Sequence, residues 1–561
     1  MNRFAKHTHI ILPALGGMIV AFAWMTPQAS LAQWMQHPLR HDAAAAAITA
    51  ANWARWGWTL GGLTLLCMPW ILSDHRSSSA VPPRGGRALA AAILLAVVWR
   101  MLQARDGLWY DEIASLGTYV VHGPGVIMGN AFTTANHPLQ SLLSWCMLPI
   151  GVEPWIRAPS ILTGALAVLG AWWIGIATRP GTSLATWMAF CMALLPAAVN
   201  AASEARGYGL MIAASSLSTG LALMAMQFGG SWRWVLYAIV LALGVWSHFV
   251  TAMVGVGHVI LALWMVRTPS QRVIAMRLLA AVACAAVLAM SLWSPLLPDL
   301  LQTRSQLITS RGDEPSWLGV QSSLLIWQSL GFSALPNHLG LGNISLALLA
   351  VPLLISGVIG CVQDRRTHTP LAAAGLGLPV ALILVWLLGS WFYARFMLFS
   401  VPAISLIAGV GAANLCNANE TNSRHRFRCL HWATILMAVT SWGILGCMWS
   451  RQPIREAVAF IAEHRTQNEV IVGIGLSDDV VQWYAMMNDL TIHPTGPNGI
   501  HTNHVMDRLH PHWIIQLYPS HTQPAFHSAM ETTPLTTWTP KPFAGSIEDG
   551  DVVVYHRAVH P

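Results

Sequence analysis

The sequence predicts an all-α polytopic membrane protein that carries a small α/β domain at its C-terminal end. Of its 561 residues, 55% are hydrophobic and only 9% are charged, and the mean hydropathy is +0.52. These values are typical of membrane proteins rather than of soluble domains. Most of the net charge of +7 comes from arginines in short loops. That distribution indicates membrane topology rather than a nucleic-acid surface.

The first half of the chain alternates apolar runs with arginine-bearing loops. The first run, 9–25, is a signal peptide or an uncleaved helix, because residues 29–32 have some likeness to a signal-peptidase site. We favour the helix, and both interpretations leave 33–53 outside. The next predicted spans are 54–72, 88–101, 157–177, 184–202 and 208–228.

The second half begins with an apolar run, 234–265, long enough for two tightly linked spans of the ~20 residues that a crossing needs. Further predicted spans are 278–297, 343–362, 371–389, 396–415 and 430–449. Two other apolar segments, 137–150 and 324–341, are predicted not to cross, because crossing would place arginine clusters on both sides. The count is then about thirteen spans.

The tail after residue 450 has a different pattern. Strand-like runs at 469–475, 513–517 and 551–555 alternate with helical spacing at 455–465 and 478–488, and Ser477 is suited to cap the second helix. This alternation predicts a small α/β domain. The expected domains are therefore two N-terminal helices in 1–86, the main transmembrane domain in 87–449 and the α/β domain in 450–561.

Two adjacent acids, Asp111 and Glu112, follow the apolar run 88–101 and lie in the predicted outer loop. Acids next to a membrane span need stabilisation, so they are candidates for a functional site. A carboxylate there can act as a general base or hold a divalent cation. The competing interpretation is an ordinary solvated loop acid.

Further candidates occur near the same predicted membrane face: His137, Glu204, Arg206, Tyr208, His248 and Arg395. Arg206 and Arg395 suit a phosphate because guanidinium is a planar fork of donors, although an arginine at a helix end can also snorkel. His137 suits a phosphate or a metal, or is a polar interfacial residue. A lone histidine among apolar residues, such as His248, is more often structural.

Several chemistries lack their sequence patterns. The chain has no GxxxxGK[ST], GxSxG or HExxH motif, and GxGxxG does not follow the strand at 469–475. A cytoplasmic nucleotide-driven machine is therefore disfavoured. The eight cysteines form no CxxC pair and lie in or beside apolar runs, so we interpret them as small packing residues.

Read together, the motifs form an ordered set: DE (111–112), HP (137–138), RAPS (157–160), SEARGY (203–208), SHF (247–249) and YARF (393–396). This set resembles the membrane glycosyltransferases of the GT-C fold, and more narrowly the bacterial clan of protein O-mannosyltransferases and the lipid A aminoarabinose transferase. The resemblance covers about 88–415. It implies transfer, with inversion, of a sugar from a polyprenyl-phosphate-linked donor to a lipid, glycan or protein acceptor.

The resemblance also implies roles and a location. Asp111 is the expected base, with Glu112 supporting the site or a metal, and Arg206, Arg395 and Tyr208 are expected at the donor's lipid phosphate. A divalent cation (Mg²⁺, Mn²⁺ or Zn²⁺) often accompanies the acid in such enzymes. The expected location is the bacterial inner membrane, with the active site on the extracytoplasmic face.

The chain departs from the family pattern in two places. Leu139 and Gln140 follow HP where the family often has a second proline and a tyrosine, and two extra spans precede the usual first helix. The tail after residue 450 carries none of the motifs, so the resemblance gives it no catalytic role.

Two other functions fit the same topology. One is another lipid-processing transferase, such as an O-antigen ligase. The other is a transporter or flippase of lipid-linked envelope precursors, which would be expected to show polar residues or helix breaks at midspan and often an internal repeat. In this sequence the charged residues gather at one face and no repeat is evident.

Overall fold

The computed structural model describes most of the chain, in residues 2–74, 76, 85–133, 136–302, 353–388, 394–416, 450–474, 478–495, 502–519, 538–545 and 550–557. These residues belong to two compact units. The first unit is made of 1–101, 119–332 and 347–437, and the second of 102–118, 333–346 and 438–561.

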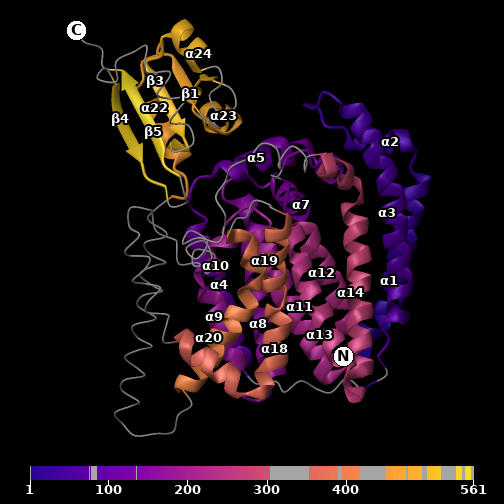
Figure 1. The fold of residues 1–561 in the computed structure, drawn as a ribbon. Coiled ribbons are helices and arrows are strands. Elements are labelled where there is room, and N and C mark those ends of the chain that lie inside the picture. Colours follow the sequence, from indigo (N-terminus) through magenta and orange to yellow (C-terminus); the bar gives the residue numbers. More distant parts are fainter. Residues whose placement is uncertain are drawn as a thin grey trace, which may run out of the picture. The chain divides into compact units, whose positions relative to one another are not determined.

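The first unit is a bundle of apolar helices (Figure 1). In the described part of the chain, eight helices are long and apolar enough to cross a membrane, which confirms a multi-pass membrane protein. The principal helices are α1 (Asn2–Met25), α2 (Gln28–Met35), α3 (Ala43–Ile71), α4 (Gly86–Gln103), α6 (Pro124–Gly129), α7 (Pro138–Met147), α8 (Ala158–Thr178), α9 (Leu184–Leu194), α10 (Pro196–Ala201), α11 (Tyr208–Phe228), α12 (Ser231–Ser247), α13 (Ala252–Val266), α14 (Arg272–Trp293), α18 (His368–Gly375), α19 (Gly377–Leu388) and α20 (Val401–Cys416).

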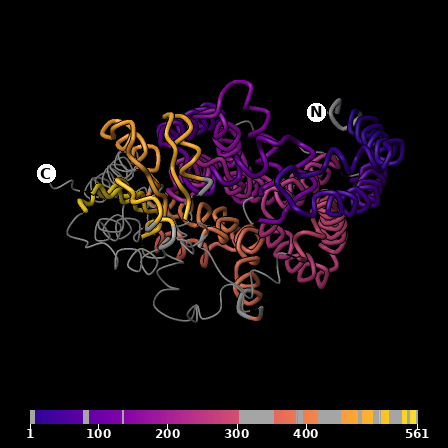
Figure 2. The backbone as a smooth tube through the Cα atoms, turned by 90° about the horizontal axis from the view of Figure 1, so that it is seen from above, coloured from indigo at the N-terminus to yellow at the C-terminus, as the bar shows by residue number. Residues whose placement is uncertain are grey.

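Helix α11 is the most enclosed of these spans, with 89% of its apolar window buried. It packs between α8 and α12. Its contact with α8 is close because the facing positions are small: a Cβ at Gly220 would lie 2.8 Å from the Gly170 carbonyl oxygen. In Figure 2, the N-terminal helices lie at one side of the bundle, where α3 packs along α14. Helix α11 is therefore enclosed by its neighbours within the unit.

Several sequence predictions are confirmed within this unit. The predicted span 208–228 has the bounds of α11, and the long run 234–265 is two helices, α12 and α13, with His248 at the turn between them. The segment 137–150 contains only α7, whose ten residues extend about 15 Å and cannot cross a bilayer. The predictions for 324–341 and 430–449, and the Ser477 cap, lie outside the described residues.

One predicted span is wrong as a single helix. The run 184–202 is broken at Leu195, whose backbone is extended, into α9 and α10. Pro196 has no N–H group and therefore leaves the Met192 carbonyl without its helical partner. The fully buried Arg100 of α4 supplies donors there, at 3.5 Å from the Met192 carbonyl oxygen and 3.2 Å from that of Ala193. The guanidinium thus stabilises a break that leads into the loop carrying Arg206.

Ion pairs form among loops and helix ends that the predicted topology places on the same side of the membrane. They are Arg76–Asp74 (2.8 Å), Arg277–Asp74 (2.7 Å) and Arg179–Asp364 (2.7 Å) on the predicted inner side, and Arg40–Asp299 (2.8 Å) on the predicted outer side. Helix α11 shows that its two ends belong to different sides. Its last carbonyls, those of Ala225 and Met226, accept hydrogen bonds from Arg76. Arg206 and Tyr208 lie at its other end, about 30 Å away for a 21-residue helix.

The second unit contains a five-stranded sheet with strand order β2-β1-β3-β5-β4. Strand β1 pairs in parallel with β2 and β3, and β5 pairs antiparallel with β3 and β4. The elements are α5 (Tyr110–Thr118), α22 (Ile454–His464), β1 (Ile471–Ile474), α23 (Asp478–Met487), β2 (Ile492–Pro494), α24 (Thr502–Leu509), β3 (Trp513–Leu517), β4 (Trp538–Phe543) and β5 (Val552–Arg557). The predicted small α/β domain is confirmed.

Helices cover the sheet on both faces. From α22, Phe460 contacts the rings of Trp513 and Phe543, and from α24, Met506 packs with Val472 and other residues of the opposite face. Every residue of β1 and β3 is buried, as expected for strands covered on both faces. Strand β4 carries two prolines that argue against a strand, but it lies at the edge of the sheet, where a missing N–H group is tolerated.

Candidate functional site

Five side chains from four separate segments of the first unit meet at the start of α11. We call them the His–Arg cluster: His137, Arg206, Tyr208, His248 and Arg395. The rings of His137 and His248 stack at 5.1 Å, and both contact the Tyr208 ring, at 5.5 Å and 5.1 Å. The guanidinium carbons of Arg206 and Arg395 lie 6.0 Å and 5.6 Å from the centre of the same tyrosine ring.

Hydrogen bonds to the backbone join the motifs around this cluster. The His137 Nδ1 lies 3.1 Å from the Ser247 carbonyl oxygen, and the Ser247 hydroxyl donates to the Gly207 carbonyl (3.2 Å). The Ser160 hydroxyl donates to the Arg206 carbonyl (3.4 Å). The motifs HP, RAPS, SEARGY and SHF are distant in sequence, yet they form one connected structure. The YARF motif joins it through Phe396, whose ring lies 5.5 Å from that of His248.

Four side chains of the cluster are buried, Arg395 is partly buried, and the two histidines are neutral at neutral pH. The exposed fraction is 7% for His137, 4% for His248, 4% for Arg206 and 2% for Tyr208. Burial, followed by the charge of Arg206, holds the pKa of His137 well below its ordinary value of 6.5. The same two causes lower the pKa of His248 to about 3.

The hydrogen bond of His137 identifies its tautomer. A carbonyl oxygen can only accept, so Nδ1 of the neutral ring carries the proton and Nε2 presents a lone pair. Among the described residues, neither the buried His137 Nε2 nor the buried His248 Nδ1 has a hydrogen-bond partner. Buried polar atoms are normally satisfied, so these two nitrogens point to a ligand that completes the site.

The cluster has the features of an anion site. Two guanidinium groups converge on one ring, and the 21-residue helix α11 begins there, so its N-terminal end adds partial positive charge. Guanidinium groups match the oxygens of a phosphate or a carboxylate in a planar, two-point geometry. An anion bound between the arginines would also favour protonation of the neighbouring histidine rings, which could then donate to it.

Gly207 is the position at which the cluster leaves least space. A Cβ placed there would lie 2.6 Å from the Ser247 carbonyl oxygen and 2.8 Å from His137 Nδ1. Real side chains do not approach other atoms this closely, so any substitution must displace the Ser247 carbonyl or the His137 ring, which are hydrogen-bonded to each other. The glycine is required by this close approach, since its φ of −66° is ordinary.

The two acids of the DE motif belong to the second compact unit and differ in environment. Glu112 is 1% exposed and accepts a hydrogen bond from the Trp109 N–H (3.2 Å), three residues earlier. This is the contact that a carboxylate makes when it closes the first turn of a helix. Asp111 is partly exposed. The structure thus distinguishes a buried carboxylate that supports the start of α5 from a partly exposed one.

The sequence-predicted site residues therefore fall into groups. His137, Arg206, Tyr208, His248 and Arg395 are brought together, including the histidine for which the sequence favoured a structural role. Glu204 is partly exposed two residues before Arg206 and remains a candidate. Sequence reasoning did not assign roles to Ser160, Ser247 and Phe396. They lie inside the quoted motifs, but a serine that links two backbones has no signature beyond its position.

The described residues contain no group of three or more His, Cys, Asp or Glu side chains placed to hold a metal ion. They therefore do not supply the three side-chain ligands of a closed site. The divalent cation stays a prediction from the resemblance.

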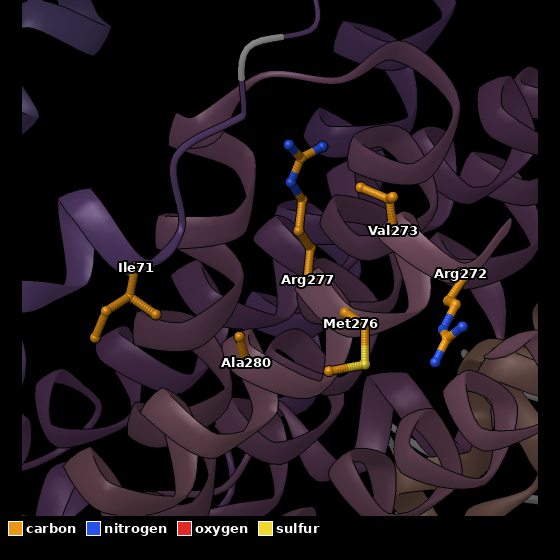
Figure 3. A pocket seen from close by; sticks show the side chains of 6 residues that line it. All are labelled: Ile71, Arg272, Val273, Met276, Arg277 and Ala280. Carbon is orange, nitrogen blue, oxygen red and sulfur yellow. The ribbon is translucent and has the colours of Figure 1, made fainter.

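A surface pocket of about 440 Å³ lies elsewhere, between the end of α3 and the start of α14 (Figure 3). Its lining residues are Ile71, Arg272, Val273, Met276, Arg277 and Ala280. Arg277 pairs with Asp74, which also binds Arg76 at the far end of α11. The pocket therefore lies at the opposite end of the bundle from the His–Arg cluster, and we do not include it in the site.

Comparison with known proteins gives structural neighbours only. No protein-family model matches the sequence, and neither does any curated protein. Among solved structures, the chain is similar to the oligosaccharyltransferase of Archaeoglobus fulgidus with a tethered acceptor peptide, at 11% identity and a TM-score of 0.47, over 77% of this chain and 69% of that one. It is also similar to ArnT from Cupriavidus metallidurans bound to undecaprenyl phosphate, at 13% identity and a TM-score of 0.45, over 84% and 97%.

A third neighbour is the arabinosyltransferase EmbB from Mycobacterium smegmatis, at 13% identity and a TM-score of 0.40, over 77% of this chain and 36% of that one. All three are glycosyltransferases, the kind of enzyme that the ordered motifs resemble.

Proposed function

We propose that this protein is a membrane glycosyltransferase that moves a sugar from a polyprenyl-phosphate-linked donor to an acceptor at the extracytoplasmic face of the bacterial inner membrane. The observation that carries the proposal is the His–Arg cluster, a buried anion site at one end of a transmembrane bundle. A ligand that is anionic and embedded in lipid fits this position best. The phosphate of a polyprenyl carrier meets both conditions.

The arginines bind the phosphate and also stabilise the leaving group. As the bond between the sugar's anomeric carbon and the phosphate oxygen breaks, negative charge grows on the departing polyprenyl phosphate. Arg206 is buried, Arg395 is partly buried, and both lie beside the Tyr208 ring before a ligand binds, so their stabilisation of that charge needs little reorganisation. An interaction that strengthens as charge develops raises the rate as well as the affinity.

Asp111 is the proposed general base. It removes the proton from the acceptor's hydroxyl or amine as that group attacks the anomeric carbon from the side opposite the phosphate, so the reaction inverts the configuration. Asp111 suits this role better than Glu112, because Glu112 is buried and accepts a backbone hydrogen bond at the start of α5. A positioned base contributes about 10²–10⁴ in rate.

The proposed side of the membrane follows from charge. The loops with Arg76, Arg179 and Arg277 form ion pairs at the end of the bundle opposite the cluster. Positively charged loops favour the cytoplasm, so the cluster is expected at the extracytoplasmic face. Nucleotide sugars are scarce there, which makes a lipid-linked donor the simpler source of the sugar.

The test is a transfer assay with purified protein in lipid nanodiscs. The protein is incubated with a panel of polyprenyl-phosphate sugars and with envelope lipid, glycan and protein fractions as acceptors, and release of polyprenyl phosphate is measured. The parent protein should release it with at least one donor, and Arg206→Ala should not at the same donor concentration. If no donor is consumed but the intact lipid-linked sugar crosses a vesicle membrane, the protein is a flippase and the proposal is wrong.

A further inference from the structure

The segment that carries the acids is attached to the C-terminal α/β domain. Both belong to the second compact unit, and α5 packs against α23. The four residues before Asp111 are Gly107, Leu108, Trp109 and Tyr110, and Leu108 and Trp109 are 0% and 4% exposed. A loop segment this buried is held by its surroundings rather than by its own sequence.

Tyr484 of α23 makes the central contact. Its hydroxyl accepts from the Leu108 N–H (2.5 Å) and donates to the Leu108 carbonyl (3.4 Å), so it satisfies both backbone groups of that residue. Tyr484 is itself 1% exposed. A buried hydroxyl bonded in two directions fixes both position and orientation, because its loss would remove both of these hydrogen bonds to the Leu108 backbone.

Three further contacts surround the first. Gln452 accepts through Oε1 from the Tyr110 N–H (3.1 Å), and Tyr518 contacts the Tyr110 ring edge-on at 5.5 Å. A Cβ at Gly107 would lie 3.0 Å from the Arg455 Cβ and 3.1 Å from the Tyr484 oxygen. The segment 107–110 is therefore held in place by contacts with side chains that are far from it in sequence and that come from three parts of the C-terminal domain.

We propose that Tyr484 and Gln452 are positioning residues for Asp111, so that the C-terminal domain, which carries no catalytic motif, sets the geometry of the base. Tyr110 and Asp111 are the first two residues of α5, and Glu112 closes that turn from within. A displacement of the backbone at Leu108 or Tyr110 therefore also displaces Asp111. Misplacement of a reacting group by about 1 Å can cost up to about 100-fold in rate.

This inference rests on the proposed role of Asp111, and its first test does not. Hydrogen exchange of individual backbone amides is measured on the full-length protein in nanodiscs. In Tyr484→Phe, the Leu108 amide should exchange roughly 2- to 12-fold faster than in the parent, as expected for the loss of one ordinary hydrogen bond. The Tyr110 amide should respond in the same way to Gln452→Met.

The matched control is Tyr555→Phe. Tyr555 lies on β5 of the same domain and donates its hydroxyl to the Gln516 Oε1 (3.1 Å), so the substitution removes the same atom at a position away from the acid segment. It should leave the Leu108 amide unchanged. If the Leu108 amide exchanges at the same rate in the parent and in both tyrosine variants, Tyr484 does not hold the Leu108 backbone and the inference is wrong.

The second test measures turnover with the donor sugar found active above. Tyr484→Phe should lower kcat roughly tenfold while the Kd for undecaprenyl phosphate stays within about twofold, since the proposed phosphate site belongs to the other unit. In an Asp111→Asn background, Tyr484→Phe should cost nothing more, because it acts through Asp111. An additive loss would overturn the positioning role. If Asp111→Asn itself turns over normally, the proposed base is wrong. The exchange data still decide whether Tyr484 holds the Leu108 backbone. If Tyr484→Phe folds poorly, Gly107→Ala takes its place, because the added Cβ crowds Tyr484 and should have the same effects on exchange and turnover.

Discussion

Replacing Arg206 by alanine should weaken binding of the lipid phosphate strongly. A hydrogen bond to a charged group contributes about 1.5–3 kcal/mol, which corresponds to a factor of about 12 to 150 in affinity. Arg206 is only 4% exposed before any ligand binds, so the cost of removing it from water is borne in folding and not in binding. We therefore expect a loss near the upper end of that range, about 100-fold.

A lysine at the same position separates charge from geometry. Arg206→Lys keeps a positive charge but loses the planar fork, so its affinity should fall between those of the parent and the alanine variant. Arg395→Ala should behave like Arg206→Ala, because both guanidinium groups face the Tyr208 ring. If both contact one phosphate, the loss in the double variant should differ from the sum of the single losses.

The assay is the thermal stabilisation of purified protein by undecaprenyl phosphate. At a concentration 100 times the parent Kd, binding stabilises the parent by about 2.7 kcal/mol, and a 100-fold weaker variant by only about 0.4 kcal/mol. Arg272→Ala is the matched control, because Arg272 is an exposed arginine at the far end of the bundle. Equal stabilisation of Arg206→Ala and Arg272→Ala would refute the phosphate site and make Arg206 a snorkelling residue.

Three further predictions follow from the same cluster and topology. The lowered pKa values of the two cluster histidines keep both rings neutral in the folded protein. Below pH 6.5, the ordinary pKa of histidine, the unfolded chain therefore binds more protons than the folded protein does. The free energy of unfolding should therefore fall by about 1.4 kcal/mol per histidine as the pH drops from 7.5 to 5.5, measured by thermal unfolding without ligand. His137→Gln should make this fall smaller. A stability that does not change with pH, or a fall that His137→Gln leaves unchanged, would contradict the prediction. Gly207→Ala should abolish lipid-phosphate stabilisation while the protein still folds, because a Cβ there separates the Ser247 carbonyl from the histidine, and parent-like stabilisation would show that the cluster accommodates it. Periplasmic reporter fusions at Gly125 and Ser520 should be active and one at Arg366 inactive, and activity at Arg366 would invalidate the inside–outside assignment.

The sequence was sufficient to predict most of the membrane helices in the described residues, because their signal is local. An apolar run of about 20 residues usually forms a transmembrane helix, and the arginines in the loops indicate which side of the membrane is cytoplasmic. The error at 184–202 came from Pro196, whose break is stabilised by Arg100 from another helix. A single buried arginine in a predicted span was visible in the sequence, but its carbonyl partners were not, since they lie some 90 residues away.

The candidate site was predictable as a set of residues and unpredictable as a geometry. Motif order suggested that Arg206 and Arg395 serve one ligand, and the structure places both beside Tyr208. The sequence could not rank Asp111 against Glu112, because adjacent carboxylates look alike until the backbone contact of Glu112 is seen. It also gave the C-terminal tail no link to the acids, because the bond from Leu108 to Tyr484 joins residues 376 positions apart.

The role of Asp111 as the base of a sugar transfer can be tested by comparing three proteins. Turnover of a lipid-linked sugar is measured for the parent, Asp111→Asn and Glu112→Gln, with thermal unfolding and undecaprenyl phosphate affinity as controls. We predict that Asp111→Asn folds and binds the lipid phosphate normally but loses about 10²–10⁴ in rate. Glu112→Gln should lose stability and a smaller part of its rate, because it weakens the first turn of α5. Parent-like turnover by both variants would show that these acids do no chemistry and that the proposed active site is wrong.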